Sequence, residues 1–333
     1  MNMARTVRFY KTGGPEVLTI DDIPEVYPES NEVRIRVKAI GLNRAEIMLR
    51  EGIYHENPVF PSRLGYEASG VIDAVGADVK LYKKGDIVST IPSFSISQTK
   101  QGVYGESAVV PSEVVTKYPT CLSPIQGASI WMQYLTAYGA LISYGSLKPG
   151  QFIIITAASS SVGIAAIQIA KLIGAEVIAV TRNRSKRTSL YELGANFVIV
   201  TDDQNLEDEV KKITNERGAD LAFDPIAGPI LTSICNVMKN HGKIYEYGAL
   251  YYGATNYPLM PMLARSLSII GYQVLDFVLD QERLIGAKKF INHSIESGKL
   301  TPVIDNVFSL DEIKEAHYYM ESNKQLGKIV VTV

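Results

Sequence analysis

A short apolar run, a turn of small residues and a helix start follow one another in residues 151–163, whose sequence is QFIIITAASSSVG. The run from Phe152 to Ile155 is wholly apolar, which is typical of a strand buried on both faces of a parallel sheet. Val162 and Gly163 then open a helical pattern. Because a helix N-terminus carries partial positive charge and unpaired N–H groups, this unit predicts a binding site for a pyrophosphate.

The turn has fewer glycines than the usual dinucleotide-binding fingerprint, which carries three. Only Gly163 stands in a matching place, and Ser160 and Ser161 occupy the end of the turn. Small side chains still allow a ligand to approach the backbone. An ordinary strand-to-helix connection would show much the same pattern, so the turn alone leaves the choice between the two open.

The segment that follows the second strand, Glu176–Thr181, is basic. An NAD site places a carboxylate about 20 residues beyond the turn, where it binds the adenosine ribose. Here Arg182, Arg184 and Lys186 come directly after Thr181, with no acid among them. Cations bind a 2′-phosphate that a carboxylate would repel, so this segment favours NADP over NAD. A solvated basic helix start is the alternative interpretation.

Length and charge limit the class of protein. A chain of 333 residues is long enough for two domains. Its formal net charge of −2 gives no general attraction to nucleic acids or anionic membranes, so we expect neither as a partner. The chain has two cysteines, Cys121 and Cys235, no signal-peptide core, and no apolar run of the ~20 residues that span a bilayer. These features predict a soluble, cytoplasmic protein without a disulfide framework.

Two regions of the chain differ in their periodicity. Up to about Cys121, short strands separated by Gly and Pro predict a barrel-like domain, with one helix at 43–51. After Pro149-Gly150, strands alternate with helices, which predicts an α/β doubly wound parallel sheet. The predicted strands of this sheet are 152–156, 176–181, 197–201, 221–225, 243–248 and 268–274.

The predicted domains are 1–122 together with 275–333, and 123–274. The tail ends in an apolar strand, KIVVTV, at 328–333. We expect this strand to join the first domain, because the parallel sheet is already complete without it.

The sequence shows no pattern typical of a metal centre or of a nucleophilic catalyst. The four histidines are scattered, neither cysteine has a partner at zinc spacing, and there is no G-x-S-x-G turn. We therefore expect no bound metal.

Several segments together resemble the zinc-free branch of the medium-chain dehydrogenase/reductase superfamily, the quinone oxidoreductases or ζ-crystallin-like reductases. They match in order and spacing over nearly the whole chain: GLNRAEIMLREGIY (41–54), LGYEASGVIDAVG (64–76), GVYGESAVVP (102–111), LTAY (135–138), AASSSVG (157–163), GADLAFDPIAG (218–228) and YEYGAL (245–250). The resemblance implies a GroES-like β-barrel catalytic domain, formed by 1–122 and 275–333, and a Rossmann domain, formed by 123–274. With the basic segment, it implies NADPH as the cofactor.

This chain departs from the zinc-dependent relatives at their metal ligands. Asn43 stands where they have a cysteine, their His-Glu pair becomes Tyr66-Glu67, and their third ligand falls near Met132. Amide and phenol groups are poor zinc ligands, so the resemblance implies a zinc-free site. The family also commonly has two glycines at positions 160 and 161, where serine hydroxyls offer hydrogen bonds to a pyrophosphate instead.

The resemblance places the catalytic and substrate-contacting side chains in the first domain. Asn43 and Tyr54 are the candidates for contacting the acceptor oxygen, with Tyr54 as the candidate proton donor. Asn43 equally suits a helix N-cap, and Tyr54 equally suits packing. The predicted substrate pocket comprises Tyr66, Tyr104, Trp131 and Met132, of which Trp131 and Met132 equally suit core packing.

The cofactor contacts are predicted along the second domain. The resemblance implies that Thr136 touches the nicotinamide and that Lys186 binds the 2′-phosphate. The backbone after a sheet strand, at Tyr247-Gly248-Ala249, is expected to meet the carboxamide. The full predicted set is Thr136, Ser160, Ser161, Val162, Gly163, Thr181, Arg182, Arg184, Lys186, Tyr247, Gly248 and Ala249.

The absence of zinc ligands limits the reaction. Without a Lewis acid, hydride transfer needs an acceptor that is already electron-poor, such as a quinone or an α,β-unsaturated carbonyl. We therefore predict an NADPH-dependent reductase of such compounds. The alternatives are an NADP-dependent alcohol dehydrogenase-like enzyme, or an NADPH-binding protein with a structural or RNA-binding role. We also expect a homodimer, because the apolar strand at 268–274 is the last in the sheet and forms its edge.

Overall fold

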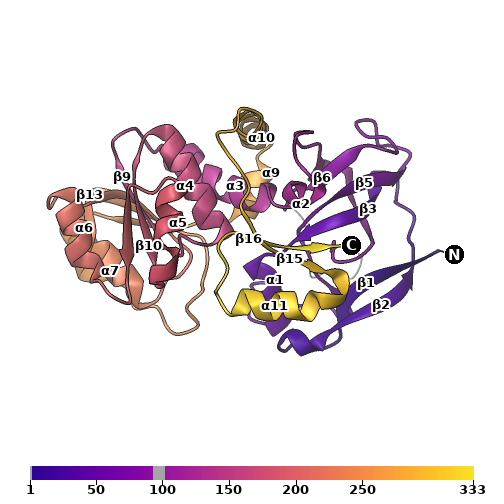
Figure 1. Ribbon diagram of the computed structural model, residues 1–333, viewed down its shortest axis with the longest axis horizontal. Coiled ribbons are helices and arrows are strands. Elements are labelled where there is room, and N and C mark those ends of the chain that lie inside the picture. The colour runs from indigo at the N-terminus through magenta and orange to yellow at the C-terminus, as the bar shows by residue number, and fades with distance from the viewer. Residues whose placement is uncertain (1, 93–101) are drawn as a thin grey trace. The chain divides into compact units, whose positions relative to one another are not determined.

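The computed structural model describes residues 2–92 and 102–333, which form two compact units. The first unit runs to Met132 and also contains Pro302–Val333, and the second is Gln133–Thr301. Figure 1 shows the two units with many of their helices and strands labelled. In the described part of the chain, no helix combines the length and apolarity needed to cross a bilayer.

The first unit is built on two mainly antiparallel sheets. The smaller has the order β2-β1-β4, and the larger has the order β15-β16-β3-β5-β6-β8, with β7 also paired to β3. The strands are β1 (Met3–Phe9), β2 (Leu18–Pro24), β3 (Glu32–Gly41), β4 (Ser62–Arg63), β5 (Glu67–Val75), β6 (Ile87–Thr90), β7 (Ser107–Pro111), β8 (Val115–Thr116), β15 (Ile304–Ser309) and β16 (Lys328–Thr332). Its helices are α1 (Arg44–Glu51), α2 (Pro124–Gly127) and α11 (Ile313–Glu321).

The C-terminal strand joins the first unit, as predicted from the completeness of the parallel sheet without it. β16 pairs antiparallel with β3, so that Val331 faces Ile40 and Val330 faces Gly41. Val330 and Val331 are fully buried. This pairing carries Lys328, the first residue of β16, to the end of β3 that precedes α1.

The second unit contains the predicted doubly wound parallel sheet, with strand order β11-β10-β9-β12-β13-β14. Its strands are β9 (Phe152–Ile155), β10 (Glu176–Thr181), β11 (Phe197–Val200), β12 (Ala219–Asp224), β13 (Met238–Glu246) and β14 (Ser268–Gly271), and every neighbouring pair is parallel. The connecting helices are α4 (Ser161–Ile173), α5 (Arg187–Glu192), α6 (Leu206–Thr214), α7 (Pro229–Val237) and α8 (Leu259–Arg265). The strand order reverses between β9 and β12, which is where parallel sheets of this kind bind their ligands.

The structure divides the chain at different points from the predicted domain boundaries. Helices α9 (Val274–Leu279) and α10 (Gln281–Glu296) belong to the second unit, although 275–333 was assigned to the first. Phe277 and Phe290 of these helices contact Tyr138, with ring centroids 6.1 and 5.3 Å apart. Tyr138 ends α3 (Trp131–Tyr138), so aromatic packing, rather than sheet membership, decides where these helices belong.

Candidate active site

The turn after β9 has the features of a phosphate-binding turn. Ser160 caps α4, and its Oγ accepts a hydrogen bond of 3.0 Å from the N–H of Gly163. A Cβ at Gly163 would lie 2.6 Å from the carbonyl oxygen of Ala157, so only glycine allows the helix to approach the strand end this closely. Ser161 and Val162 stand in the first turn of α4, where N–H groups have no acceptor within the helix. These groups fit a pyrophosphate.

Lys186 connects the basic segment to this turn. Its Nζ donates a hydrogen bond of 3.0 Å to Oγ of Ser159. Arg184 instead pairs with Asp203 at 2.9 Å, and Arg182 is exposed. Thr181, at the end of β10, is buried. Of these cations, Lys186 is therefore the one that the fold brings to the turn after β9.

The ends of the central strands meet at the same edge of the sheet. The hydroxyl of Thr156 donates to the buried carboxylate of Asp224, which ends β12. The N–H of Tyr247 donates to the carbonyl oxygen of Asp224 at 3.0 Å, and the Tyr247 ring stacks on Phe223 with centroids 3.9 Å apart. Gly248 and Ala249 follow and are exposed, as a backbone site for a ligand requires.

In the first unit, Asn43 is held by a buried network. It is the N-cap residue of α1, and its N–H donates to Oε2 of Glu46 at 2.7 Å. Its side-chain nitrogen donates to the carbonyl of Gly41 at 3.0 Å, and its Oδ1 accepts from Nζ of Lys328 at 2.7 Å. The amide of Asn43 thus has a partner at both ends.

Glu67 connects the same lysine to the start of α3. Its Oε1 accepts hydrogen bonds from three successive N–H groups, those of Ile130, Trp131 and Met132, at 3.0, 2.7 and 3.2 Å. Its Oε2 lies 2.6 Å from Nζ of Lys328. A carboxylate at a helix N-terminus and beside an ammonium group is stabilised from both sides.

Glu46 holds the tyrosines that were predicted to line the pocket. It is fully buried and accepts from the N–H of Tyr66 at 2.9 Å and from the hydroxyl of Tyr104 at 2.6 Å. Burial raises the pKa of Glu46, and these hydrogen bonds, with the charge of Lys328, oppose that rise. The hydroxyl of Tyr104 therefore has a structural partner.

Tyr54 is the most accessible of the three tyrosines predicted to contact substrate in the first unit. The Tyr66 hydroxyl donates to that of Tyr54 at 3.4 Å, and Tyr54 is half-buried, whereas Tyr66 and Tyr104 are each 1% exposed. Burial raises the pKa of Tyr54, so its hydroxyl keeps its proton at neutral pH. Trp131 is fully buried, Met132 is 9% exposed, and Thr136, on α3, is 5% exposed.

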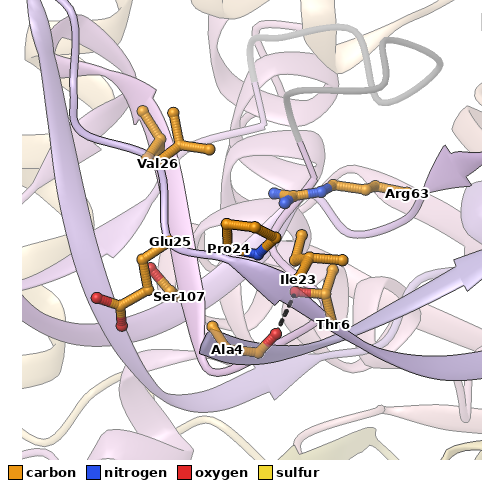
Figure 2. A pocket seen from close by; sticks show the side chains of 9 residues that line it. Ala4, Thr6, Ile23, Pro24, Glu25, Val26, Arg63 and Ser107 are labelled. Carbon is orange, nitrogen blue, oxygen red and sulfur yellow. Dashed lines mark hydrogen bonds between the residues drawn. The ribbon is translucent and has the colours of Figure 1, made fainter. Parts of the chain in front are cut away.

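A cavity of about 330 Å³ in the first unit lies elsewhere, beside β1 and β2 (Figure 2). Arg63 extends along it, and burial lowers the pKa of this guanidinium to about 10. None of the predicted site residues lines this cavity.

Family models match both parts of the chain. Residues 29–120 match the alcohol dehydrogenase GroES-like domain, and residues 161–293 match a model described as zinc-binding dehydrogenase. Human quinone oxidoreductase is 32% identical over 316 residues, which cover 95% of this chain and 93% of that protein. The chain belongs to the quinone oxidoreductase family. It is thus an oxidoreductase of the medium-chain dehydrogenase/reductase superfamily, as its motifs indicated.

Solved structures of related oxidoreductases share the whole fold. Escherichia coli quinone oxidoreductase, solved in complex with NADPH, aligns with a TM-score of 0.91 at 26% identity and covers 99% of this chain and 100% of that one. An NAD-dependent alcohol dehydrogenase aligns with a TM-score of 0.89 at 31% identity and covers 99% of each chain.

In this member of the quinone oxidoreductase family, the resemblance assigns Asn43, Tyr66-Glu67 and Met132 to the zinc-ligand positions of the zinc-dependent relatives. Asn43, Glu67 and Met132 are linked around one lysine. Asn43 and Glu67 both bind Nζ of Lys328, and the N–H of Met132 binds Glu67. Within residues 2–92 and 102–333, no three His, Cys, Asp or Glu side chains are grouped so that they could hold a metal ion. The matched model whose description names zinc covers 161–293, which contains none of these three positions.

Lys328 was not among the predicted site residues, and neither was Glu46. The available signal was a single cation at the start of an otherwise apolar final strand, KIVVTV. A lysine is almost never fully buried without a partner, so this pattern calls for a buried carboxylate elsewhere in the chain.

Proposed function

We propose that this protein is an NADPH-dependent, zinc-independent reductase of quinones or activated α,β-unsaturated carbonyls. The observation that carries the proposal is the ammonium of Lys328, which lies 2.7 Å from Asn43 and 2.6 Å from Glu67. A cation held there by amide and carboxylate disfavours a second cation at the same place. The acceptor must then be electron-poor by itself, as quinones and enones are.

The second unit supplies the groups that would hold NADPH, whose chemistry when bound is hydride donation. The N–H groups of Ser161 and Val162 suit the pyrophosphate, and Lys186 suits the 2′-phosphate. The hydrogen bond from Lys186 to Ser159 supports this assignment, because it holds a cation beside the turn. The NADPH complex of the Escherichia coli relative supports it as well.

Tyr54 is the side chain that we assign to the acceptor oxygen. It is half-buried and protonated, and the Tyr66 hydroxyl donates to it, which leaves its own proton for an acceptor. We assign Asn43 a positioning role, because Lys328 and Gly41 already bind both ends of its amide.

The test is a screen of the purified protein against quinones, enals, enones and simple ketones, once with NADPH and once with NADH. Each reaction is monitored by the loss of absorbance of the reduced cofactor. We expect turnover with quinones or enones, a preference for NADPH, and little turnover of simple ketones. A clear preference for NADH, or turnover limited to alcohols and ketones, would contradict the proposal.

A second candidate is an alcohol dehydrogenase. The likeness to an NAD-dependent alcohol dehydrogenase at 31% identity favours it. It predicts reduction of NADP or NAD by alcohols at a rate comparable with the quinone reaction, and the same screen run in the oxidative direction decides between them.

We further propose that the protein is a homodimer whose second copy covers the β14 edge of the second unit. α8, which directly precedes this edge strand in the chain, has no buried residue and exposes Met260 and Leu263 at 71% and 66%. Apolar surface next to an unpaired strand edge is a common site of subunit association. A monomer by light scattering at micromolar concentration would contradict this proposal.

A further inference from the structure

Two carboxyl groups meet at the ends of adjacent strands in the second unit. Asp224 ends β12, Glu246 ends β13, and the two residues are paired in the parallel register. Asp224 is fully buried, and both side-chain oxygens of Glu246 are shielded from solvent. Among the described residues, no donor group reaches the oxygens of Glu246, and the residue paired with it in the sheet is Asp224.

The hydrogen bonds around Asp224 show which of the two carries the charge. Its carboxylate accepts from the hydroxyl of Thr156, from the N–H of Ile226 at 3.2 Å and from the N–H of Ala227 at 2.8 Å. Glu246 has no such donors. Since two buried carboxylates on paired positions would repel each other, and only Asp224 has donors, the proton that relieves this repulsion belongs on Glu246. Burial and the neighbouring Asp224 raise the pKa of Glu246 to about 9, in agreement with this assignment.

Asp224 joins the segments that surround the phosphate-binding turn. Thr156 follows β9 directly and precedes Ala157, which has a positive φ of 43°. Ala227 also has a positive φ, 61°, in the segment after β12. The Asp224 carboxylate therefore binds Ala227 directly, and it also binds Thr156, the residue before Ala157.

We propose that Glu246, carrying a proton at neutral pH, is a positioning residue that holds the Asp224 carboxylate against Thr156 and Ala227 and so fixes the cofactor-binding turn. This inference rests on the proposed cofactor site. When the proton leaves, two carboxylates face each other across neighbouring strands and repel. The turn then loses its support, and affinity for NADPH falls at high pH.

The other ionisable groups around the pair do not titrate in the same range. Burial raises the pKa of Tyr247, and the charge of Asp224 raises it further. On α7, burial and Glu246 raise the pKa of Cys235 to about 11, while Arg265 of α8 opposes this rise. Glu246 is thus the group of this cluster expected to lose its proton between pH 8 and 10.

The test measures the dissociation constant of NADPH by its fluorescence from pH 7 to 10, with Glu246→Gln as the key variant. The Gln amide donates to Asp224 and never ionises. We expect NADPH binding by the wild type to weaken about fivefold or more between pH 8 and 10, the size of a typical coupling between sites. Glu192→Gln, at an exposed position, is the matched control, and its dissociation constant for NADPH should change with pH as that of the wild type does. The dissociation constant of Glu246→Gln should stay nearly constant over the same pH range.

Identical pH profiles for Glu246→Gln and the wild type would overturn the inference, although NADPH binding itself would still support the proposed function. Failure of the wild type to bind NADPH at any pH would overturn both. A second measurement does not depend on the variant's affinity for cofactor. The infrared spectrum of the wild type at pH 7 should contain a protonated-carboxyl band that Glu246→Gln lacks. A wild-type spectrum without that band would refute a proton on Glu246.

Discussion

Nζ of Lys328 lies 2.6 Å from Oε2 of Glu67, and both side chains are completely excluded from solvent. The two residues are 261 positions apart in the chain. Their contact joins the last strand of the protein to β5 and, through Glu67, to the first turn of α3. A buried charge pair of this kind is satisfied only when every member is present.

Replacing Lys328 with Met should destabilise the protein strongly. The change leaves Glu67 charged and buried beside three N–H groups, and loss of one partner of a buried pair costs about 3–5 kcal/mol. Urea unfolding measures the loss. The double variant Lys328→Met with Glu67→Gln should recover much of it, and a double variant no more stable than the single one would show that the pair is not coupled.

Replacing Lys186 with Ala should weaken NADPH binding selectively. A charge-assisted contact with phosphate contributes about 1.5–3 kcal/mol, so the dissociation constant should rise about 10- to 100-fold. NADH, which lacks the 2′-phosphate, should bind as before. Arg184→Ala is the matched control, since Asp203 already pairs with that side chain. An equal loss of affinity for NADPH and NADH would contradict the proposed contact between Lys186 and the 2′-phosphate.

Replacing Tyr54 with Phe should lower kcat for a quinone or enone while NADPH affinity stays constant. Proton donation by a positioned side chain contributes about 10²–10⁴-fold in general, and the lower end is expected for an activated acceptor. Tyr66→Phe removes the hydroxyl that donates to Tyr54 and should have a smaller effect. A kcat unaffected by Tyr54→Phe would exclude Tyr54 as the proton donor.

The fold and part of the site were predictable because their signals are local. Buried strands such as Phe152–Ile155, the turn of small residues that ends at Ser161 and the cations after Thr181 are each read from neighbouring residues. The contact of Lys328 with Asn43 spans 285 positions and has no local periodicity. The assignment of α9 and α10 to the second unit likewise depends on a contact that is distant in sequence, the packing of their aromatic side chains against Tyr138. The amphipathic pattern of a helix does not specify which element the helix packs against.

Acid should destabilise the protein through His317. This side chain is buried, its Nδ1 lies 2.9 Å from the Arg50 guanidinium, and burial followed by the charge of Arg50 lowers its pKa to about 3. Between pH 6.5 and 3, His317 binds a proton in the unfolded chain but not in the folded chain. The contribution of this neutral side chain to stability is therefore complete above pH 6.5 and declines below it. Thermal melting from pH 7 to 4 should show a shallower decline for His317→Gln, and equal slopes would refute this role.

Thermal melting also tests whether Glu246 carries a proton. For this residue the dependence of stability on pH has the opposite sign to that for His317. Because the pKa of Glu246 is raised from 4.5 to about 9, the folded chain keeps a proton that the unfolded chain releases, and stability falls as pH rises between these values. The melting temperature of Glu246→Gln should therefore exceed that of the wild type increasingly from pH 5 to 9. A constant difference over this range would contradict a proton on Glu246.

We propose hydride transfer without zinc, at a site where Lys328 lies between Asn43 and Glu67. The most direct measurement is quinone reduction by NADPH on protein whose zinc content has been determined and then reduced below stoichiometry with a chelator. The rate should be the same before and after chelation, and added zinc should not raise it. A rate that falls with zinc content and returns when zinc is restored would contradict the account.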